Sequence, residues 1–225
     1  MELPGAQRVM VYRDVEALSL AVAQRIAELA TQSIALRGRF RIALAGGQTP
    51  GRCYELLREL PLDWSRVEIY FGDERCLPPG DKDRNDAMAF DALIRHIDLP
   101  QANLHPIPAE LGADQAALVY ARLLDKTGAL DLVLLGLGED GHTASLFPDN
   151  AALGSDAAAV AVYGAPKPPP ERVSLSLLTL NAARSKLFIV SGDGKRDALR
   201  HIAQKPAGRI VGAEWHLDRA AWPDQ

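Results

Sequence analysis

The sequence is poor in cysteine and has no long apolar run. Its 225 residues include only two cysteines, Cys53 and Cys76, which are too few to cross-link a chain of this length. No short C-x-x-C spacing indicates a zinc site, so we expect two reduced thiols and no metal. No stretch reaches the roughly 18 apolar residues of a membrane span, and residues 1–13 lack the apolar run of a signal peptide. We therefore expect a cytoplasmic protein with no membrane partner.

An excess of positive charge is also missing. The chain carries 25 Lys and Arg side chains against 29 Asp and Glu, which gives a formal net charge of −4. Without a general positive field we expect no nucleic-acid partner, and any anionic ligand must be held by a local site. What the chain does have is a hydrophobic fraction of 48%. That fraction excludes a disordered chain, and the length favours one domain over residues 1–225.

Apolar periodicity divides the chain into alternating helices and strands. A helix is predicted to begin after Asp14, whose side chain can cap it, and to end at Gly38. Four units of strand, loop and helix follow along the chain. Their strands are expected at residues 39–45, 67–71, 130–135 and 186–190. This alternation predicts an α/β fold in which helices cover both faces of a mostly parallel sheet.

The loops after these strands contain most of the glycine and charge that stand out in the sequence. They are residues 46–50, 72–75, 136–142 and 191–195. The carboxyl ends of parallel strands meet at one edge of a sheet, which is where doubly wound folds bind their ligands. We therefore expect the four loops to converge on one site. The proline-rich segment 165–170 is interpreted as a further loop within the same domain.

The first loop is a candidate phosphate cradle. Gly46 and Gly47 allow backbone amides to approach an anion, the hydroxyl of Thr49 lies beside them, and a helix is expected to begin just beyond. The loop lacks the Gly-Lys-Ser/Thr ending of a nucleotide P-loop, so it gives no support to an ATPase. Taken alone, it fits an ordinary strand-to-helix turn equally well.

The second loop places two acids and an arginine at the end of a strand. Asp73, Glu74 and Arg75 are costly to bury there unless they pair with one another or meet a ligand. The Arg75 guanidinium could hold a phosphate through two parallel hydrogen bonds. The alternative is a salt-bridged surface turn. Asn85, ten residues further along, is a candidate for the same edge, although spacing alone does not place it there.

The third loop contains the histidine best placed for proton transfer. Residues 136–141 match G-x-G-x-x-G, but their two acids would put negative charge where a dinucleotide pyrophosphate belongs, so a nicotinamide enzyme is disfavoured. His142 follows at the expected ligand edge, where an imidazole suits general base catalysis, oriented by either Asp140 or Asp73. A Ser-His-Asp hydrolase is disfavoured because no G-x-S-x-G elbow is present and Ser145 lies only three residues from His142.

Three basic residues complete the candidate site. Lys195 follows a glycine-rich loop at a predicted helix start, and Lys167 and Arg172 flank the proline-rich segment. Each is commonly a solvated surface charge. A phosphorylated substrate could recruit any of them if the loops converge.

Together these motifs resemble those of the 6-phosphogluconolactonases of the oxidative pentose phosphate pathway. The matching segments lie in order from about residue 45 to residue 195, and residues 140–148, Asp-Gly-His-Thr-Ala-Ser-Leu-Phe-Pro, are the most specific. The resemblance implies a modified Rossmann-like, doubly wound fold. It also implies hydrolysis of 6-phosphoglucono-δ-lactone to 6-phosphogluconate without a metal or organic cofactor. The expected partner is therefore a phosphorylated sugar lactone, and the oligomeric state stays open, with a monomer compatible.

The resemblance also implies roles for particular residues. His142 is expected to be the base that activates water, with Asp73 and Asp140 as the other catalytic residues. The residues expected to contact the substrate and its phosphate are Gly46, Gly47, Gln48, Thr49, Arg75, Arg172 and Lys195. The oxyanion donor stays open between the backbone amides near residues 46–47 and those of residues 138–141.

Two positions depart from the family pattern. Gln48 stands where the family commonly has Ser or Thr, so a side-chain hydroxyl contact is not expected there. Arg84 stands where a Ser often precedes the Asn, which leaves the role of Asn85 open.

Two other functions share part of this motif set with the lactonases. The related glucosamine-6-phosphate deaminases have a glutamate at the position of Phe147, whose side chain cannot transfer a proton. Their usual Asp-Glu-Tyr also differs from the Asp-Glu-Arg that ends at Arg75. A catalytically silent sugar-phosphate sensor would keep the glycine loop and Arg75 without needing His142.

Overall fold

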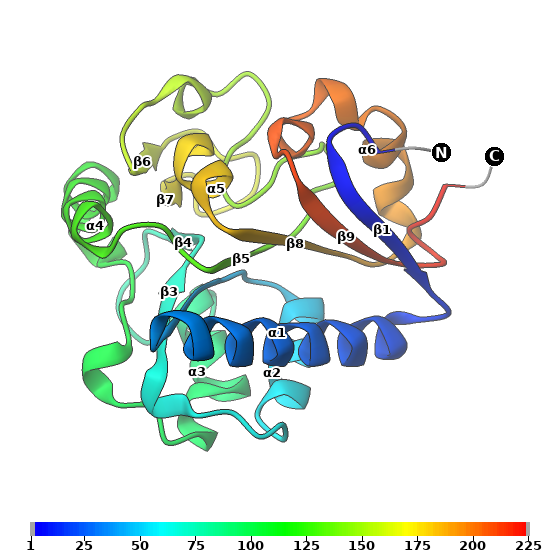
Figure 1. Cartoon of the computed structure of the whole chain (residues 1–225). Helices are drawn as coiled ribbons and strands as arrows, with labels where there is room; N and C mark the ends of the chain where they lie inside the picture. The colour runs from blue at the N-terminus through cyan, green and yellow to red at the C-terminus, as the bar shows by residue number, and fades with distance from the viewer. Residues whose placement is uncertain (1–2, 224–225) are drawn as a thin grey trace.

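The computed structural model describes residues 3–223, and its centre is a six-stranded parallel sheet (Figure 1). The strands run in the order β1-β9-β8-β5-β2-β3, and every neighbouring pair is parallel. They span Ala6–Tyr12 (β1), Phe40–Leu44 (β2), Val67–Phe71 (β3), Leu132–Leu135 (β5), Ser185–Val190 (β8) and Ala213–Asp218 (β9). The predicted α/β fold with a mostly parallel sheet is confirmed.

Helices lie on both sides of this sheet, as predicted. In Figure 1, α1, α2 and α3 lie beneath it, and α4, α5 and α6 lie on the other side. The α-helices span Val15–Arg37 (α1), Gln48–Leu57 (α2), Asn85–Ala92 (α3), Ala113–Thr127 (α4), Leu177–Ala182 (α5) and Arg196–Arg200 (α6). Short 3-10 helices span Trp64–Arg66, Ile94–His96, Gln101–Asn103, Ala109–Leu111, Ala151–Gly154, Asp193–Lys195, Ile202–Gln204 and Pro206–Arg209.

The longest helix, α1, has the predicted boundaries. Asp14 caps its amino end by accepting a hydrogen bond from Ala17 N at 2.8 Å. Gly38 ends it with a φ of 77°, a left-handed conformation that glycine adopts without steric strain. The local sequence therefore fixes both ends of the helix that covers one face of the sheet.

A second, antiparallel sheet forms from three short strands. They span Asp73–Arg75 (β4), Ala159–Val162 (β6) and Arg172–Leu175 (β7), and lie in the order β4-β7-β6. The prediction of a simple loop at residues 72–75 is wrong, because residues 73–75 pair with residues 172–174 of β7. The proline-rich segment connects β6 to β7, so the small sheet joins two parts of the predicted site that lie about a hundred residues apart in sequence.

Two helices near the predicted loops are short. The helix after the first loop, α2, ends at Leu57, and α6 ends at Arg200 before a separate 3-10 turn. Strands β1 and β9 were not predicted. They add two parallel strands to the far side of β8 and bring the two ends of the described chain together in Figure 1.

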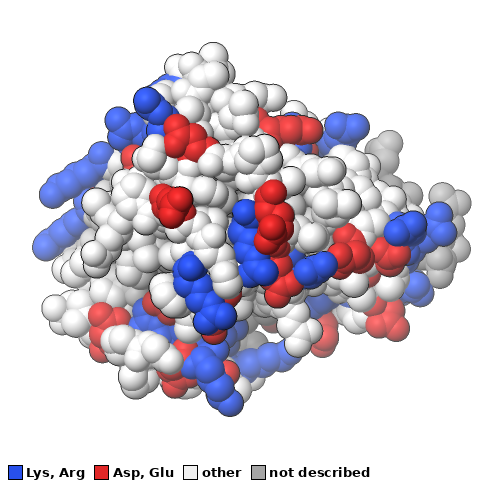
Figure 2. All heavy atoms as spheres, turned by 90° about the horizontal axis from the view of Figure 1, so that it is seen from below, with Lys and Arg blue, Asp and Glu red and all other residues white. Residues whose placement is uncertain are grey.

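The buried side chains of these layers form one core. Its largest members include Trp215, Tyr54, Tyr70 and Phe188, and both cysteines are free thiols. No helix within residues 3–223 is long and apolar enough to cross a membrane. On the face seen from below in Figure 2, basic and acidic side chains are interspersed rather than gathered by sign.

Candidate active site

A cavity of about 600 Å³ opens where β2, β3 and β5 end. Its walls come from the loops after these strands, the small antiparallel sheet, the proline-rich segment and the turn after β8. Eight of the ten predicted site residues line it. These are Gly46, Gly47, Asp73, Arg75, Asp140, His142, Arg172 and Lys195. The convergence of the loops at one sheet edge is therefore present in the structure.

Gln48 and Thr49 do not line this cavity with their side chains. The Gln48 side chain is exposed, and Thr49 Oγ1 lies 2.6 Å from Ser191 Oγ, with which it shares a hydrogen bond. Both residues form the first turn of α2, where backbone N–H groups have no partner within a helix. Any contribution of this turn to anion binding therefore comes from its backbone.

The His142 ring is fixed by the loop that follows β5. Its Nδ1 lies 2.6 Å from Asp140 Oδ1, and the same carboxylate oxygen accepts from His142 N at 3.1 Å. Because a carboxylate can only accept, the proton of the neutral imidazole sits on Nδ1 and the lone pair on Nε2. Burial raises the pKa of Asp140, but the backbone N–H and ring of His142 lower it more, so the carboxyl stays ionised. The structure pairs the ring with Asp140.

Glycine is required inside this turn. A Cβ on Gly138 would lie 2.0 Å from His142 Nδ1 and 2.6 Å from Asp140 Oδ1. The turn is closed by Gly138 N donating to His142 O at 2.8 Å. On its other side the imidazole packs against Phe147, with ring centroids 4.5 Å apart and planes tilted by 46°. The imidazole is thus held by a hydrogen bond, a tight turn and an aromatic neighbour.

Asp73 is held by different partners. Its Oδ2 accepts from Ser145 Oγ at 2.5 Å, and its Oδ1 accepts from Asn85 Nδ2 at 3.1 Å. The Asn85 side chain fits only because residue 46 is glycine, since a Cβ there would lie 1.9 Å from Asn85 Oδ1. Asn85 and Asp73 both line the cavity, so the suggestion that Asn85 folds back to this edge is confirmed.

Two arginines face each other across the small sheet. Arg75 of β4 and Arg172 of β7 are directly opposite in register, an arrangement that is unfavourable for like charges unless something compensates them. Burial lowers the pKa of the Arg172 guanidinium; the Asp73 carboxylate opposes this shift and Arg75 adds to it. Arg75 donates to Asp83 O, while its buried Nε has no hydrogen-bond partner among residues 3–223. An anion between the two guanidiniums would compensate both.

Arg172 also shapes the cavity wall. Its guanidinium donates to Lys167 O at 3.0 Å and Pro169 O at 3.3 Å, and it lies 5.7 Å from the centroid of the Phe147 ring. It therefore supports both the proline-rich wall and the ring that packs on the histidine. Lys195, on the turn after β8, adds a further cation to the lining.

Several lining residues were not singled out by the sequence. In the sequence Phe147 stands out only as the residue at a deaminase glutamate position, and its contact with the imidazole depends on the turn at residues 143–146, where Ala144 has a φ of 49°. Glu139 and the prolines at 166 and 168 also line the cavity. The sequence could have indicated these three residues only by their position, since each lies within a loop that is already part of the predicted site. No group of three or more His, Cys, Asp or Glu suited to a metal occurs in the described part of the chain.

Comparisons with known proteins agree with the family resemblance and with the fold. The profile of the family described as glucosamine-6-phosphate isomerases/6-phosphogluconolactonase matches residues 13–217. The chain is 37% identical to a 6-phosphogluconolactonase of Mycobacterium leprae, over 95% of this chain and 96% of that protein. It is 33% identical to a human 6-phosphogluconolactonase, over 98% and 95%. A crystal structure of a 6-phosphogluconolactonase from Thermotoga maritima has a TM-score of 0.88 at 26% identity, covering 94% of this chain and 99% of that one.

Proposed function

Because the chain belongs to the glucosamine-6-phosphate isomerase/6-phosphogluconolactonase family, we propose that it hydrolyses 6-phosphoglucono-δ-lactone to 6-phosphogluconate in the pentose phosphate pathway. The observation that carries this proposal is the His142–Asp140 pair in a cavity that also presents Arg75, Arg172 and Lys195. Hydrolysis of a phosphorylated lactone uses a general base for the chemical step and an anion-binding wall to hold the phosphate.

In the proposed reaction His142 is the general base. Its Nε2 lone pair accepts a proton from a water molecule as the water oxygen attacks the lactone carbonyl. The tetrahedral intermediate then collapses, the bond between the carbonyl carbon and the ring oxygen breaks, and the imidazolium returns its proton to that oxygen. The Asp140 carboxylate fixes the tautomer and stabilises the imidazolium while it lasts. The product acid ionises at neutral pH, so each turnover releases one proton.

The basic wall would hold the phosphate group. A phosphate between Arg75 and Arg172 would relieve the repulsion between two facing guanidiniums and satisfy the unpartnered Nε of Arg75. Lys195 would add a point charge. Binding energy gained at the phosphate, away from the reacting carbonyl, would orient the lactone and select the phosphorylated sugar.

The surroundings of the imidazole favour a lactonase over the related deaminase. Among residues 3–223 the carboxylate that contacts the His142 ring is Asp140, and Phe147 packs on the ring where the deaminases have a glutamate. A phenyl ring cannot carry a proton for ring opening. Hydrolysis needs only the base, a water and an oxyanion donor.

The test is proton release from freshly generated 6-phosphoglucono-δ-lactone in weak buffer near pH 7, with spontaneous hydrolysis subtracted. The His142→Ala variant is expected to lose at least about a hundredfold of the enzymatic rate, because a positioned base contributes roughly that much or more. The matched control is His201→Ala, which removes an exposed histidine that also contacts an aspartate, Asp197. It should leave the rate unchanged.

Binding of 6-phosphogluconate, measured by calorimetry, separates the remaining possibilities. His142→Ala is expected to bind the product with an affinity close to that of the wild type, because the phosphate contacts are intact. Product binding without lactone turnover by the wild type would overturn the proposal in favour of a sensor. Near-normal turnover by His142→Ala would overturn the assignment of the base.

A further inference from the structure

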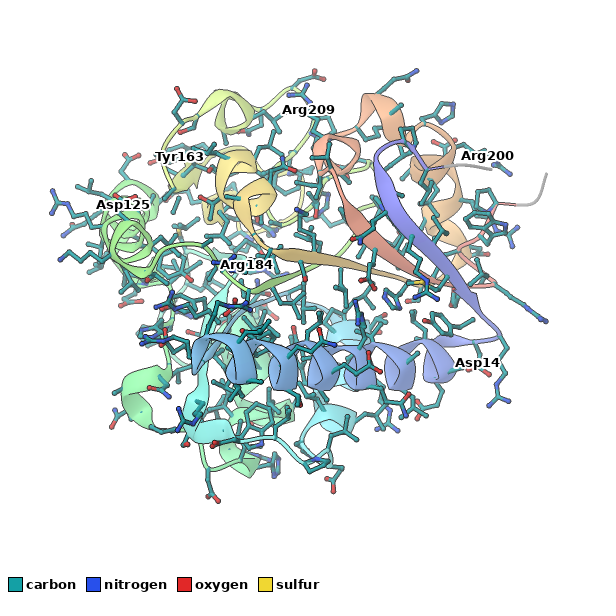
Figure 3. The ribbon with its side chains drawn as sticks, in the orientation of Figure 1. Asp14, Asp125, Tyr163, Arg184, Arg200 and Arg209 are labelled. Carbon is teal, nitrogen blue, oxygen red and sulfur yellow. The ribbon has the colours of Figure 1, made fainter. Side chains whose placement is uncertain are left out.

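A second concentration of arginine lies at the amino ends of the central strands. Arg39 and Arg41 stand at the start of β2, Arg37 ends α1 and Arg184 immediately precedes β8. Because the six strands are parallel, this edge of the sheet is opposite to the edge that carries the active-site cavity. Figure 3 shows Arg184 near the carboxyl-terminal end of α1, away from the loops above the sheet. The cluster is therefore separate from the proposed lactone site.

The side chains border two adjoining hollows. One, of about 230 Å³, is lined by Arg37, Arg39, Arg41 and Arg184 together with Asp131. The other, of about 290 Å³, is lined by residues that include Arg39, Arg66, Ser65 and Glu68. Arg39 lines both, so the two hollows meet at this residue. Each hollow has room for a phosphate-sized group.

The carboxylates in these hollows already have their hydrogen bonds. Asp131 Oδ1 accepts from Arg37 Nε at 2.9 Å, and its Oδ2 accepts from Arg41 N at 2.9 Å. Glu68 accepts from Arg39 Nη1 at 3.2 Å, Arg41 Nε at 3.1 Å and Tyr70 Oη at 3.1 Å. Burial raises the pKa of Glu68, but the bonds from the arginines lower it more, so this carboxyl is ionised at neutral pH.

The guanidinium groups, in contrast, have donors to spare. Arg184 Nε lies 3.4 Å from Asp131 Oδ1, and Arg41 Nε donates to Glu68. Within residues 3–223 the Nη groups of these two arginines donate no hydrogen bond to a protein acceptor. Four arginines and one carboxylate, that of Asp131, line the first hollow. Two of these arginines, Arg39 and Arg41, also pair with Glu68 of the second hollow. The chain as a whole has a net charge of −4, so this local excess of positive charge runs against its general composition.

We propose that this arginine cluster is a second anion site, and that its ligand carries two linked phosphate groups, one in each hollow. Guanidinium groups bind phosphate oxygens through paired, charge-assisted hydrogen bonds, and the unused Nη groups supply such pairs. The bridging position of Arg39 matches the bridge of a diphosphate. Inorganic diphosphate and a nucleoside diphosphate both present this group, and the test below distinguishes the two sources.

The test is calorimetric titration of the protein with pyrophosphate, and separately with ADP and orthophosphate. The variant Arg39→Gln/Arg184→Gln is expected to bind pyrophosphate at this site at least about tenfold more weakly, because each lost charged hydrogen bond is worth a factor of that order. The matched control is Arg200→Gln/Arg209→Gln, which removes two exposed arginines that Figure 3 shows above the sheet and away from Arg184. A third variant, Arg75→Gln/Lys195→Gln, removes two cations of the active-site cavity, so any pyrophosphate binding that it loses belongs to that cavity.

The proposal is supported if the wild type shows a pyrophosphate site that survives in Arg75→Gln/Lys195→Gln and the control but is lost in Arg39→Gln/Arg184→Gln. It is overturned if Arg39→Gln/Arg184→Gln binds pyrophosphate as the wild type does. It is also overturned if the control Arg200→Gln/Arg209→Gln loses as much pyrophosphate affinity as Arg39→Gln/Arg184→Gln. Equal affinity for orthophosphate would also overturn the diphosphate assignment. Whichever of pyrophosphate and ADP binds more tightly identifies the source of the diphosphate. If the double variant does not fold, Arg184→Gln alone serves, since that side chain is 53% exposed.

Discussion

At the residue scale, the structure assigns the orientation of the imidazole to one carboxylate. Asp140 accepts from Nδ1 of His142, whereas Asp73 is occupied by Ser145 and Asn85. Replacing Asp140 with Asn keeps the size of the side chain but removes the charge, and it allows the amide to donate to Nδ1. That would favour the tautomer with its proton on Nε2, which cannot accept a proton from water.

We therefore expect Asp140→Asn to lower kcat for the lactone by about a hundredfold or more, with KM changed by about twofold at most. Steady-state proton-release kinetics would measure both constants. The control is Asp197→Asn, which makes the same change beside the exposed His201 and should leave kcat unaffected. A raised KM with normal kcat would show instead that Asp140 binds substrate and does not orient the base.

Residue by residue, the sequence predicted the charged members of the cavity better than the uncharged ones. His142, Arg75 and Lys195 follow strands, and a charged or titratable side chain at that edge is readily recognised. The Phe147 contact was missed because an aromatic side chain looks like core in any sequence. The choice between Asp73 and Asp140 also had to wait for the structure, since both follow strands and only distances distinguish them.

At the scale of elements, the buried Glu74 joins the small sheet to α3. Its carboxylate accepts from Asn85 N at 2.7 Å and Asp86 N at 2.8 Å, and so caps a helix whose own N-cap residue, Arg84, provides no side-chain cap. Burial raises the pKa of Glu74 to about 7, from a usual value of 4.5, although these backbone bonds oppose the shift. The native state therefore binds this proton more tightly than the unfolded state does.

The stability contributed by protonated Glu74 is complete below about pH 4.5 and is lost as the pH rises through about 7. Glu74→Gln cannot titrate. We expect the free energy of unfolding of the wild type, relative to this variant, to fall by about 3 kcal/mol between about pH 4.5 and about pH 8. Urea unfolding at both pH values would measure it, and a constant difference would contradict the prediction.

The control for the direction of this pH dependence is Glu214→Gln. Burial raises the pKa of Glu214, but its hydrogen bonds with Arg25 lower it more, so its net shift is opposite to that of Glu74. Its stabilising contribution is present above the usual pKa and is lost as the pH falls. The wild type should therefore gain stability relative to Glu214→Gln as the pH rises.

The sequence predicted the strands in which most side chains have the same environment, namely the buried interior. Strands β2, β3, β5 and β8 are largely apolar because both faces of a parallel sheet are covered. Strand β9 was missed because Glu214, His216 and Asp218 interrupt its apolar residues, yet all three are buried. They are tolerated because partners such as Arg25 and Tyr12 bond to them, and those partners lie about two hundred residues away in sequence. The three-residue β4 exists only through its pairing with β7.

At the scale of the whole molecule, the sheet separates two positively charged regions. The active-site cavity lies where the strands end, and the arginine cluster lies where they begin. Strand β2 leads from one to the other, from Arg39 and Arg41 to Gly46. The four loops at one edge of the sheet are enough to predict the cavity. That prediction does not depend on the expectation of a single domain over residues 1–225. The arginine cluster was not predicted, since its members belong to α1, β2 and the start of β8 and share no motif.

The stability of this sheet depends on β9, which lies between β1 and β8 and so connects the two ends of the chain to the rest of the molecule. Trp215, at its centre, is 1% exposed and stacks on Phe188 of β8, with ring centroids 3.8 Å apart. Truncating it to alanine removes this contact and leaves a large cavity, so we expect Trp215→Ala to lower the free energy of unfolding by about 3 to 5 kcal/mol. Urea unfolding would measure the loss. The control Leu178→Ala, at a side chain 59% exposed on α5, should change it by about 0.5 kcal/mol at most. A loss below about 1 kcal/mol in Trp215→Ala would mean that β9 contributes little to the cooperative unit, and that the sheet is stable without tight packing of the strand that lies between β1 and β8.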